Sequence, residues 1–491
     1  MTPTPRNVLW ITCDEMKASA ASVYGNAFTS MPAAERLARG GMCFDHAYVQ
    51  MPKCVPSRCS MMSGRYPHCD GFRTLKGGAG AAPGPRGEDN SMLALRADTP
   101  NLIPIMRQRG YRTCLLGKNH LVDWRLHREW FDVTPSWNYA RQVPCLPDRV
   151  TPRMKAGQLE YAGMIDPTFD MNRHMDVVTA TEAITFLEDC QRARQPFFAL
   201  VDIAKPHPTY EDYPDTPAAQ LPLESLPLPP RQPLDRAPAV ERMLRTSRGL
   251  EELDEHERRT VLRAYYSMCE FADRQVNRIL DALDRLDLTR NTLVIYTSDH
   301  GDFAGEHGCF EKWDTLFYDC LVRVPLLMRL PGAVPAGARS EALVELIDIA
   351  PTILEHLGLT PPRWMHGRSL GPLMRTEVTE HRTAVFCQGG VEPALTQRPW
   401  SPPDPTPKQR VLLEHPQTMV RAHMVRDRDL KYVYRLEGEE ELYDLRADPW
   451  ELTNIASDPA YRHRLLMLKD RLLRFLVEFE TDLPQVDHLI A

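Results

Sequence analysis

The sequence lacks an apolar run long enough to cross a bilayer, which takes about 20 residues, and it has no excess of basic residues. The net charge of −7 argues against a nucleic-acid partner, because non-specific binding to nucleic acid needs a basic surface. No signal-peptide-like apolar segment precedes the first predicted strand, so we expect a cytoplasmic protein without membrane association. The twelve cysteines form no paired framework, and we expect reduced thiols.

The apolar runs that are present alternate with helical patterns, which predicts an α/β fold. Strands are predicted at 7–12, 111–116, 197–203 and 293–297, and helices at about 99–109, 178–193 and 256–286. Strands separated by helices usually form a mostly parallel sheet with helices on both faces. We therefore expect one large, mostly parallel sheet sandwiched by helices.

Two of these helices carry clear local signals. The helix at 256–286 has apolar residues at three- and four-residue spacing, namely Val261, Tyr265, Met268, Ala272, Val276, Ile279 and Leu283. Thr99 and Pro100 are predicted to be the cap and the first residue of the helix at 99–109, which Gly110 would end.

The pattern changes after about residue 370. Short strands are predicted at 418–425, 430–434 and 441–445, followed by a helix at about 460–479. A chain of 491 residues is also long for a single core. We expect a catalytic α/β domain over 1–370 and a smaller C-terminal α+β subdomain over 371–491, with a small antiparallel sheet and a terminal helix.

Four of the predicted strands are followed by polar, ionisable residues. These residues are Asp14, Lys118, His120, His207, Asp299 and His300. In open parallel sheets, ligands bind at the carboxyl ends of the strands. Any one of these motifs could be a capped turn or a polar loop, but their shared position predicts a single active site.

The acidic members of this set suit a divalent cation. Asp14 and Asp299 offer the oxygen ligands that Ca²⁺ and Mg²⁺ favour, and the imidazole of His300 also admits Mn²⁺. We therefore expect a metal ion at the ends of the first and fourth predicted strands.

The cationic residues predict a pocket for an anion. Arg58, Lys118 and Lys312 carry permanent positive charge, and His120 and His207 can add more. Each alone could be a solvated surface group. Together with a metal they would hold a tetrahedral oxyanion, and the histidines could transfer protons during its displacement.

Cys54 is the candidate nucleophile. It opens the run Cys54-Val55-Pro56-Ser57-Arg58, and Pro56 suits the first position of a helix. Free N–H groups at a helix start attract anions and lower the pKa of a thiol. The alternative is a buried structural cysteine, which is the commoner role for a free cysteine.

These motifs together resemble a known family. Cys54–Arg58, Ser63–Pro67, Gly117–His120, Lys205–Pro208, Ser298–Gly301, Lys312 with Tyr318-Asp319, and Glu441–Leu445 are similar, in the same order, to the signatures of type I sulfatases. This family belongs to the alkaline phosphatase superfamily and has a branch of phosphonate monoester hydrolases.

The resemblance implies a mechanism and two cofactors. A dedicated formylglycine-generating enzyme would oxidise Cys54 to formylglycine (3-oxoalanine), and one hydroxyl of its hydrate would attack the sulfur of a small-molecule sulfate ester. The implied metal is one Ca²⁺, with Mn²⁺ or Mg²⁺ as alternatives. Its implied ligands are Asp14, Glu15, residue 54, Asp299 and His300.

The resemblance also implies roles for the cationic residues. Arg58 and Lys118 would hold the hydrate and the bound oxyanion. His120 would be the base that releases the product, and His207 and Lys312 would bind the sulfate, with His207 as the acid for the leaving group. The family usually has a second aspartate where this chain has Glu15. As a metal ligand, Glu15 would have to reach the metal with a side chain one methylene longer.

The expected function is therefore a sulfuric ester hydrolase. One alternative is a phosphonate monoester or phosphodiester hydrolase that uses the same site, since both reactions transfer a tetrahedral centre with similar charge. A second is a non-catalytic anion-binding protein, which would keep an unmodified Cys54. The resemblance also allows a homo-oligomer.

Overall fold

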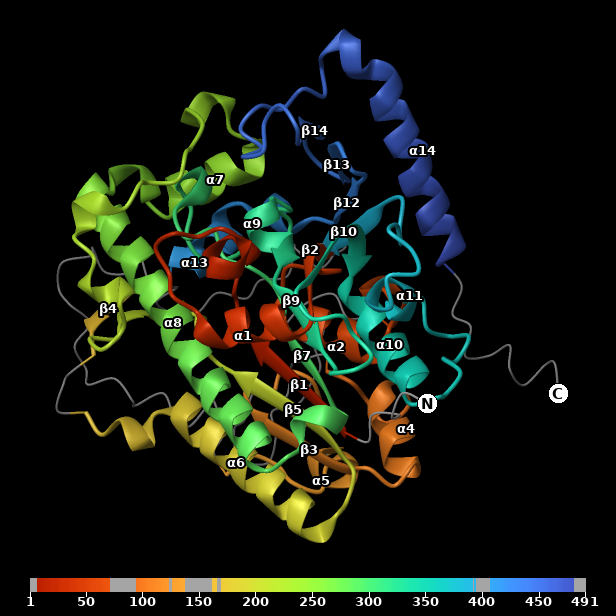
Figure 1. Cartoon of the computed structure of the whole chain (residues 1–491). Coiled ribbons are helices and arrows are strands. Elements are labelled where there is room, and N and C mark those ends of the chain that lie inside the picture. The colour runs from red at the N-terminus through yellow and green to blue at the C-terminus, as the bar shows by residue number, and fades with distance from the viewer. Residues whose placement is uncertain are drawn as a thin grey trace.

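The computed structural model describes residues 7–70, 94–122, 126–136, 161–165, 169–391, 393 and 407–480. Its centre is an eight-stranded sheet in the order β10-β2-β9-β7-β1-β5-β3, with β8 paired to β2 (Figure 1). The strands are β1 (Asn7–Cys13), β2 (Met42–Tyr48), β3 (Arg112–Gly117), β5 (Phe197–Ile203), β7 (Thr292–Thr297), β8 (Arg323–Val324), β9 (Leu326–Arg329) and β10 (Ala338–Glu345). Only β8 and β9 pair antiparallel with their neighbours, so the predicted mostly parallel sheet is confirmed.

The central strands end at one level. β1 is buried along its whole length, as expected for a strand covered on both faces of a parallel sheet. Thr12 of β1 pairs with Asp202 of β5 and Thr297 of β7, and Gly117 of β3 pairs with the same Asp202. The polar residues that follow β1, β3, β5 and β7 are therefore presented at one edge of the sheet.

Helices cover both faces of this sheet (Figure 1). α6 packs on β3 and β5 and against α8, which also packs against α1, while α2 packs against α4 and α10. The helices are α1 (Pro32–Gly40), α2 (Cys54–Ser63), α3 (Pro67–Asp70), α4 (Leu102–Gln108), α5 (His127–Trp130), α6 (Met175–Ala193), α7 (Ala239–Ser247), α8 (Glu255–Arg285), α9 (Asp319–Val322), α10 (Ile349–His356) and α11 (Gly371–Met374).

The long helix α8 agrees with its sequence signals, whereas α4 does not. All seven apolar positions predicted for α8 are buried, and Asp254 and Glu257 form a capping box at its start. The cap of α4 is Asn101, whose side chain accepts from the N–H of Ile103. The predicted cap at Thr99 is therefore wrong by two residues, because an asparagine is an equally good cap.

The C-terminal region forms the predicted small antiparallel sheet, in the order β11-β12-β13-β14. Its elements are β11 (Val385–Gly389), α13 (Pro407–Glu414), β12 (Ala422–Arg426), β13 (Leu430–Arg435), β14 (Glu441–Asp444) and α14 (Arg462–Glu478). The strand predicted from 418 begins only at Ala422, because a 3₁₀ turn occupies Pro416–Met419. One apolar core continues from the large sheet into this region, and the domain boundary at 370 stays a prediction.

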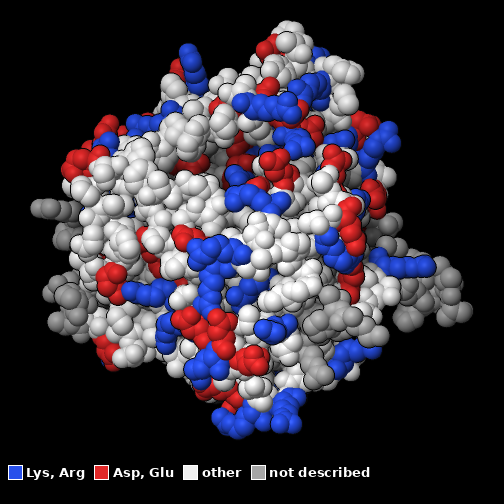
Figure 2. Space-filling model, viewed as in Figure 1, with Lys and Arg blue, Asp and Glu red and all other residues white. Residues whose placement is uncertain are grey.

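A separate two-stranded parallel sheet pairs β4 (Tyr161–Met164) with β6 (Tyr210–Asp212). Figure 2 shows acidic and basic side chains interspersed over the visible face of the molecule. No helix of the described residues has the length and apolarity needed to cross a membrane. The eleven cysteines within the described ranges are all free thiols.

Candidate active site

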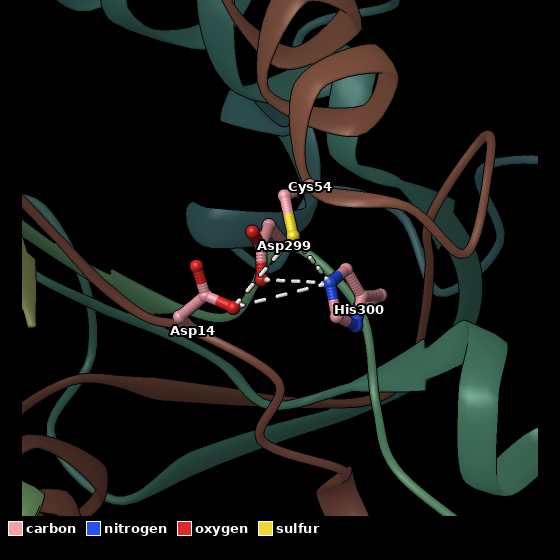
Figure 3. A group of neighbouring side chains, drawn as sticks. All are labelled: Asp14, Cys54, Asp299 and His300. Atoms are coloured by element: carbon pink, nitrogen blue, oxygen red, sulfur yellow. Dashed lines mark hydrogen bonds and ion pairs between the residues drawn. The ribbon is translucent and has the colours of Figure 1, made fainter. Parts of the chain in front are cut away.

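Three segments bring four potential ligands together at the carboxyl edge of the sheet. Asp14 directly follows β1, Asp299 and His300 lie just after β7, and Cys54 is the first residue of α2 (Figure 3). The Cys54 sulfur lies 3.2 Å from His300 Nε2 and 3.8 Å from Asp14 Oδ1. One ligand atom from each of the four residues falls within 4.8 Å of all the others.

Helix α2 begins two residues earlier than the sequence predicts. Lys53 is extended and caps the helix, Cys54 is its first residue, and Pro56 is the third. The predicted first position for Pro56 is therefore wrong. The structure tolerates this proline because the first four N–H groups of a helix have no partner within it. The thiol of Cys54 consequently lies in the first turn, beside the unpaired N–H groups.

Arg58 of α2 forms ion pairs with residues at the ends of three strands of the sheet. Its guanidinium lies 2.7 Å from Asp299, 3.0 Å from Asp14 and 2.7 Å from Asp202. Asp202 lies near the end of β5 and was missed by the sequence analysis. The available signal was a single charged residue inside the otherwise apolar run of that strand. This arrangement fixes Cys54, one turn earlier in the helix, against the ends of β1 and β7.

Two buried lysines face the carboxylates. Lys118 Nζ lies 2.8 Å from Asp14 Oδ2, and Lys312 Nζ lies 2.5 Å from Glu15 Oε2. Gly117 allows the approach of Lys118, since it has a φ of +89° and a Cβ at this position would meet the carbonyl oxygen of Asp202 at 1.9 Å. The structure thus places both predicted cations at the candidate metal site.

The two predicted histidines lie at the solvent side of the cluster. His207 donates from Nδ1 to the carbonyl of Pro208 at 2.6 Å, which leaves Nε2 3.5 Å from Glu15 Oε2, and its side chain is 23% exposed. His120 hydrogen-bonds with Cys54. Burial, helped by Lys118, lowers the pKa of both histidines, that of His207 to about 3. The imidazole of His207 is therefore neutral at pH 7 when no anion is bound.

Glu15 has an open ligand position. Its backbone has a positive φ of 70° and is held by Tyr265, whose hydroxyl donates to the Glu15 carbonyl at 2.9 Å and accepts from the N–H of Lys17 at 3.0 Å. Glu15 Oε1 is buried and has no hydrogen-bond partner among the described residues. A buried carboxylate oxygen without a donor is unfavourable, so this oxygen fits a ligand to a cation.

Burial and neighbouring charges lower the pKa of some site residues and raise the pKa of others. Burial alone would raise the pKa of Cys54, but Lys312, Lys118 and His300 lower it well below its usual value. Lys118 and Arg58 likewise hold the pKa of Asp14 down despite burial. Burial raises the pKa of Glu15 to about 8. Burial would lower the pKa of His300, but Asp299 raises it to about 9. The pKa values of Cys54 and Asp14 are thus lowered, whereas that of Glu15 is raised although Glu15 faces Lys312.

The donor set fits a divalent metal ion. Asp14 and Asp299 offer carboxylate oxygens to a group that includes His300 Nε2, whose Nδ1 donates to the carbonyl of Gly301 at 2.9 Å, while Glu15 forms a second group with Asp14 and His207. Oxygen ligands with one imidazole suit a hard or borderline cation. Cys54 is the fourth member of the group with Asp14, Asp299 and His300.

The sheet, with carboxylates, lysines and histidines gathered at its carboxyl edge, has the fold of solved sulfatase and phosphonate monoester hydrolase structures. A sequence model of the family described as Sulfatase matches residues 6–359, which is more than half of the chain. The protein therefore belongs to the sulfatase family and is a hydrolase, as the sequence motifs predict.

Individual relatives are distant but span most of the chain. An N-acetylglucosamine-6-O-sulfatase of Bacteroides thetaiotaomicron is 24% identical over 93% of this chain and 83% of its own length. Arylsulfatase K of Xenopus laevis is 26% identical over 96% and 82%. The structure of the phosphonate monoester hydrolase of Agrobacterium radiobacter superposes with a TM-score of 0.74 at 23% identity, covering 97% of this chain and 96% of the other. This last likeness establishes the fold.

Proposed function

We propose that this protein hydrolyses sulfate monoesters with a formylglycine nucleophile made from Cys54. The observation that carries this proposal is the position of Cys54 in the first turn of α2, with its sulfur between Asp14 and His300. A hydrated formylglycine at residue 54 would present its hydroxyl groups to the same two side chains. The hydrate supplies the nucleophile when it is formed.

A divalent cation, Ca²⁺ first and Mn²⁺ or Mg²⁺ as alternatives, completes the proposed site. Asp14, Asp299, His300 and residue 54, which lie together, would hold it. Glu15 would join them through its Oε1, which has no hydrogen-bond partner among the described residues. A bound cation at this position would stabilise negative charge on the ester during displacement.

The other residues of the site would orient and protonate the substrate. Lys118 and Lys312 are buried and would neutralise the sulfate oxygens. A bound anion beside His207 would raise its lowered pKa, so that Nε2 could carry the proton for the leaving alcohol. His120, which hydrogen-bonds with residue 54, would accept the proton that releases the product.

A second candidate function is hydrolysis of phosphonate monoesters or phosphodiesters. It is favoured by the structural likeness to a phosphonate monoester hydrolase and by a cationic pocket that does not distinguish sulfur from phosphorus by charge. The cytoplasmic location and the dependence on a maturation enzyme are further predictions of the sequence.

Mass spectrometry of residue 54 tests the mechanism directly. Trypsin cleaves after Lys53, Arg58 and Arg65, so Cys54 and Cys59 fall into separate peptides. Protein from a host with the maturation enzyme should show an aldehyde or its hydrate at residue 54 and an ordinary thiol at Cys59. An unmodified thiol at both positions in protein from the native organism would contradict the proposed nucleophile.

A substrate panel separates the two candidate reactions. Rates are compared for an aryl sulfate, an aryl phosphonate monoester and an aryl phosphodiester with the same leaving group. The sulfate ester should have the highest kcat/KM. If it ranks last by orders of magnitude, the protein is a phosphonate or phosphodiester hydrolase on the same site.

A further inference from the structure

Lys205 lies two residues before His207, but the proposed mechanism gives it no role. It is only 7% exposed, and lysines are almost never buried unless their charge is paired. Its ammonium donates to the Thr209 carbonyl at 3.1 Å and pairs with Glu211 Oε2 at 3.1 Å. The side chain of Lys205 therefore reaches past His207 and binds two residues that follow it in the chain.

The start of the same segment is held by α6. Asp176, a buried residue in the first turn of that helix, accepts from the N–H of Ala204 at 2.7 Å and from the N–H of Lys205 at 3.1 Å. The N–H of His207 donates to the carbonyl of Ala204 at 3.1 Å. Residues 204–209 are thus fixed at both ends, and His207 lies between the two attachments.

Buried side chains fix Glu211 in turn. Tyr213 donates to the same oxygen of Glu211 at 3.1 Å, and its hydroxyl lies 2.9 Å from His174 Nε2. His174 Nδ1 accepts from the N–H of Asp176 at 3.1 Å, so Nε2 carries the proton and donates to Tyr213. The carboxylate that pairs with Lys205 is therefore held from outside the segment that carries the active-site histidine.

The orientation of His207 depends on the backbone around it. Its Nδ1 donates to the carbonyl of Pro208 at 2.6 Å, so the imidazole moves with the peptide that follows it. Its Nε2 lies 3.5 Å from Glu15 Oε2 and is the nitrogen that would carry the proton for the leaving alcohol. A misplacement of about 1 Å can cost about 100-fold in rate.

We propose that Lys205 is a positioning residue, which joins the Thr209 carbonyl to Glu211 and thereby holds His207 Nε2 where the leaving alcohol receives its proton. The inference rests on the proposed function. In this role Lys205 acts through His207 and does not contact the ester. Loss of its ammonium should therefore matter most for esters whose leaving group needs a proton, because an acidic phenol can leave without one.

The test compares two sulfate esters in the mature enzyme. Nitrophenyl sulfate releases an acidic phenol, whereas phenyl sulfate releases a weakly acidic phenol that needs an acid catalyst. The kcat/KM of both esters is measured for the wild type, Lys205→Met and Lys205→Arg. Methionine has a similar length but no donor, while arginine keeps the charge and the donors. Arg382→Met is the matched control, since it breaks a buried ion pair with Glu345 and Asp348.

Lys205→Met should lower kcat/KM for phenyl sulfate by about 100-fold and for nitrophenyl sulfate by less than about tenfold. Lys205→Arg should restore most of the lost ratio, and Arg382→Met should leave the ratio unchanged. When Lys205→Met is added to His207→Ala, the ratio should change by less than about twofold. The residue through which Lys205 acts is then already absent.

Two results would overturn the inference while leaving the proposed function intact. One is a Lys205→Met variant whose ratio equals that of the wild type, which is the result expected of a purely structural lysine. The other is a Lys205→Met effect of full size in the His207→Ala background. Failure of the wild-type enzyme to cleave any sulfate ester would instead contradict the proposed function itself.

A second variant covers the case in which Lys205→Met does not fold. Glu211→Gln keeps the size of the side chain and removes the charge that faces the ammonium. It should shift the ratio of the two esters in the same direction as Lys205→Met, by a smaller factor. An unchanged ratio in folded Glu211→Gln would also overturn the inference.

Discussion

Two buried clusters in this protein both combine acidic and basic side chains. They differ in whether each carboxylate oxygen has a hydrogen-bond partner among the described residues. In the first, Tyr66 donates to Glu345 at 2.7 Å, and Arg382 pairs with both Glu345 and Asp348. Backbone N–H groups also donate to both carboxylates. In the active-site cluster, Glu15 Oε1 has no donor among the described residues. Buried charge is therefore common to both clusters. The active-site cluster differs because its unpartnered oxygen lies beside Asp14 and His207, which could share a metal ion with it.

Replacing the central side chain of the active site should give the largest effect. Cys54→Ala removes the proposed nucleophile, so kcat/KM for an aryl sulfate should fall by more than about 10⁴-fold. The melting temperature should change little, because only one small side chain is lost. Cys59→Ala is the matched control, since Cys59 is a buried thiol in the same helix and its variant should stay active. Substantial activity in Cys54→Ala would show that another group attacks the ester.

Removing the arginine of the cluster around Glu345 should lower stability and leave activity unchanged, which is the reverse of the effect expected for Cys54→Ala. Arg382→Ala leaves Glu345 and Asp348 buried without their cation, which should lower the free energy of unfolding by about 3–5 kcal/mol. Urea unfolding measures this change, and the folded fraction should keep its kcat. Arg375→Ala removes an exposed pair and should change stability by less than about 1 kcal/mol. Equal effects of the two variants would mean that the buried network contributes no special stability.

Glu15→Gln tests the contrast between the two clusters by changing a proposed metal ligand. The change removes one negative charge from the proposed ligand set, so metal affinity should fall by at least about tenfold. Titration with a competing chelator, followed by a metal-sensitive dye, gives this affinity without reference to turnover. Glu211→Gln is a buried control whose carboxylate pairs with Lys205 rather than with Lys312. An unchanged affinity in Glu15→Gln would remove Glu15 from the metal site.

The smallest expected effect concerns pH and the satisfied cluster. Burial and the nearby Arg65 and Arg382 lower the pKa of His366 to about 3 in the folded state, and its Nδ1 accepts from the N–H of Tyr66. The unfolded chain takes up this proton near pH 6.5. The stabilising contribution of neutral His366 is thus complete above pH 6.5 and is lost as the pH falls towards 3.

His366→Asn tests this dependence, because its Oδ1 can accept the same N–H but cannot titrate. The slope of unfolding free energy against pH between 6 and 4 should become shallower by up to about 1 kcal/mol per pH unit. Chemical denaturation at several pH values gives the slope. An unchanged slope would mean that His366 does not titrate differently in the two states.

The sequence was sufficient for the architecture and the position of the site, for a physical reason. Parallel strands covered by helices must be apolar throughout, so the polar residues after β1, β3, β5 and β7 stood out against uniform runs. Their shared position at strand ends predicted that they would meet. The same reasoning could not assign their roles, which depend on side-chain contacts and stay predictions.

The sequence could not show at which residue each helix begins, or which distant residues contact each other. Helix starts at Cys54 and Leu102 differ from the predictions by two residues, because several neighbouring positions offered acceptable caps. Asp202 and Tyr265 act through residues far away in the chain, on Arg58 and on the backbone of Glu15. Such long-range pairs leave no local pattern in a single sequence.

The three carboxylates that pair with Arg58 determine when Cys54 becomes inaccessible to a modifying enzyme. They join α2 to β1, β5 and β7, and in the closed structure Cys54 is only 1% exposed. During synthesis, residues 54–58 leave the ribosome well before β5 and β7 exist. The proposed conversion of Cys54 therefore has a window in nascent chains that closes once Arg58 finds its partners. Maturation and folding would compete for the same segment, and slower translation would favour the modified enzyme.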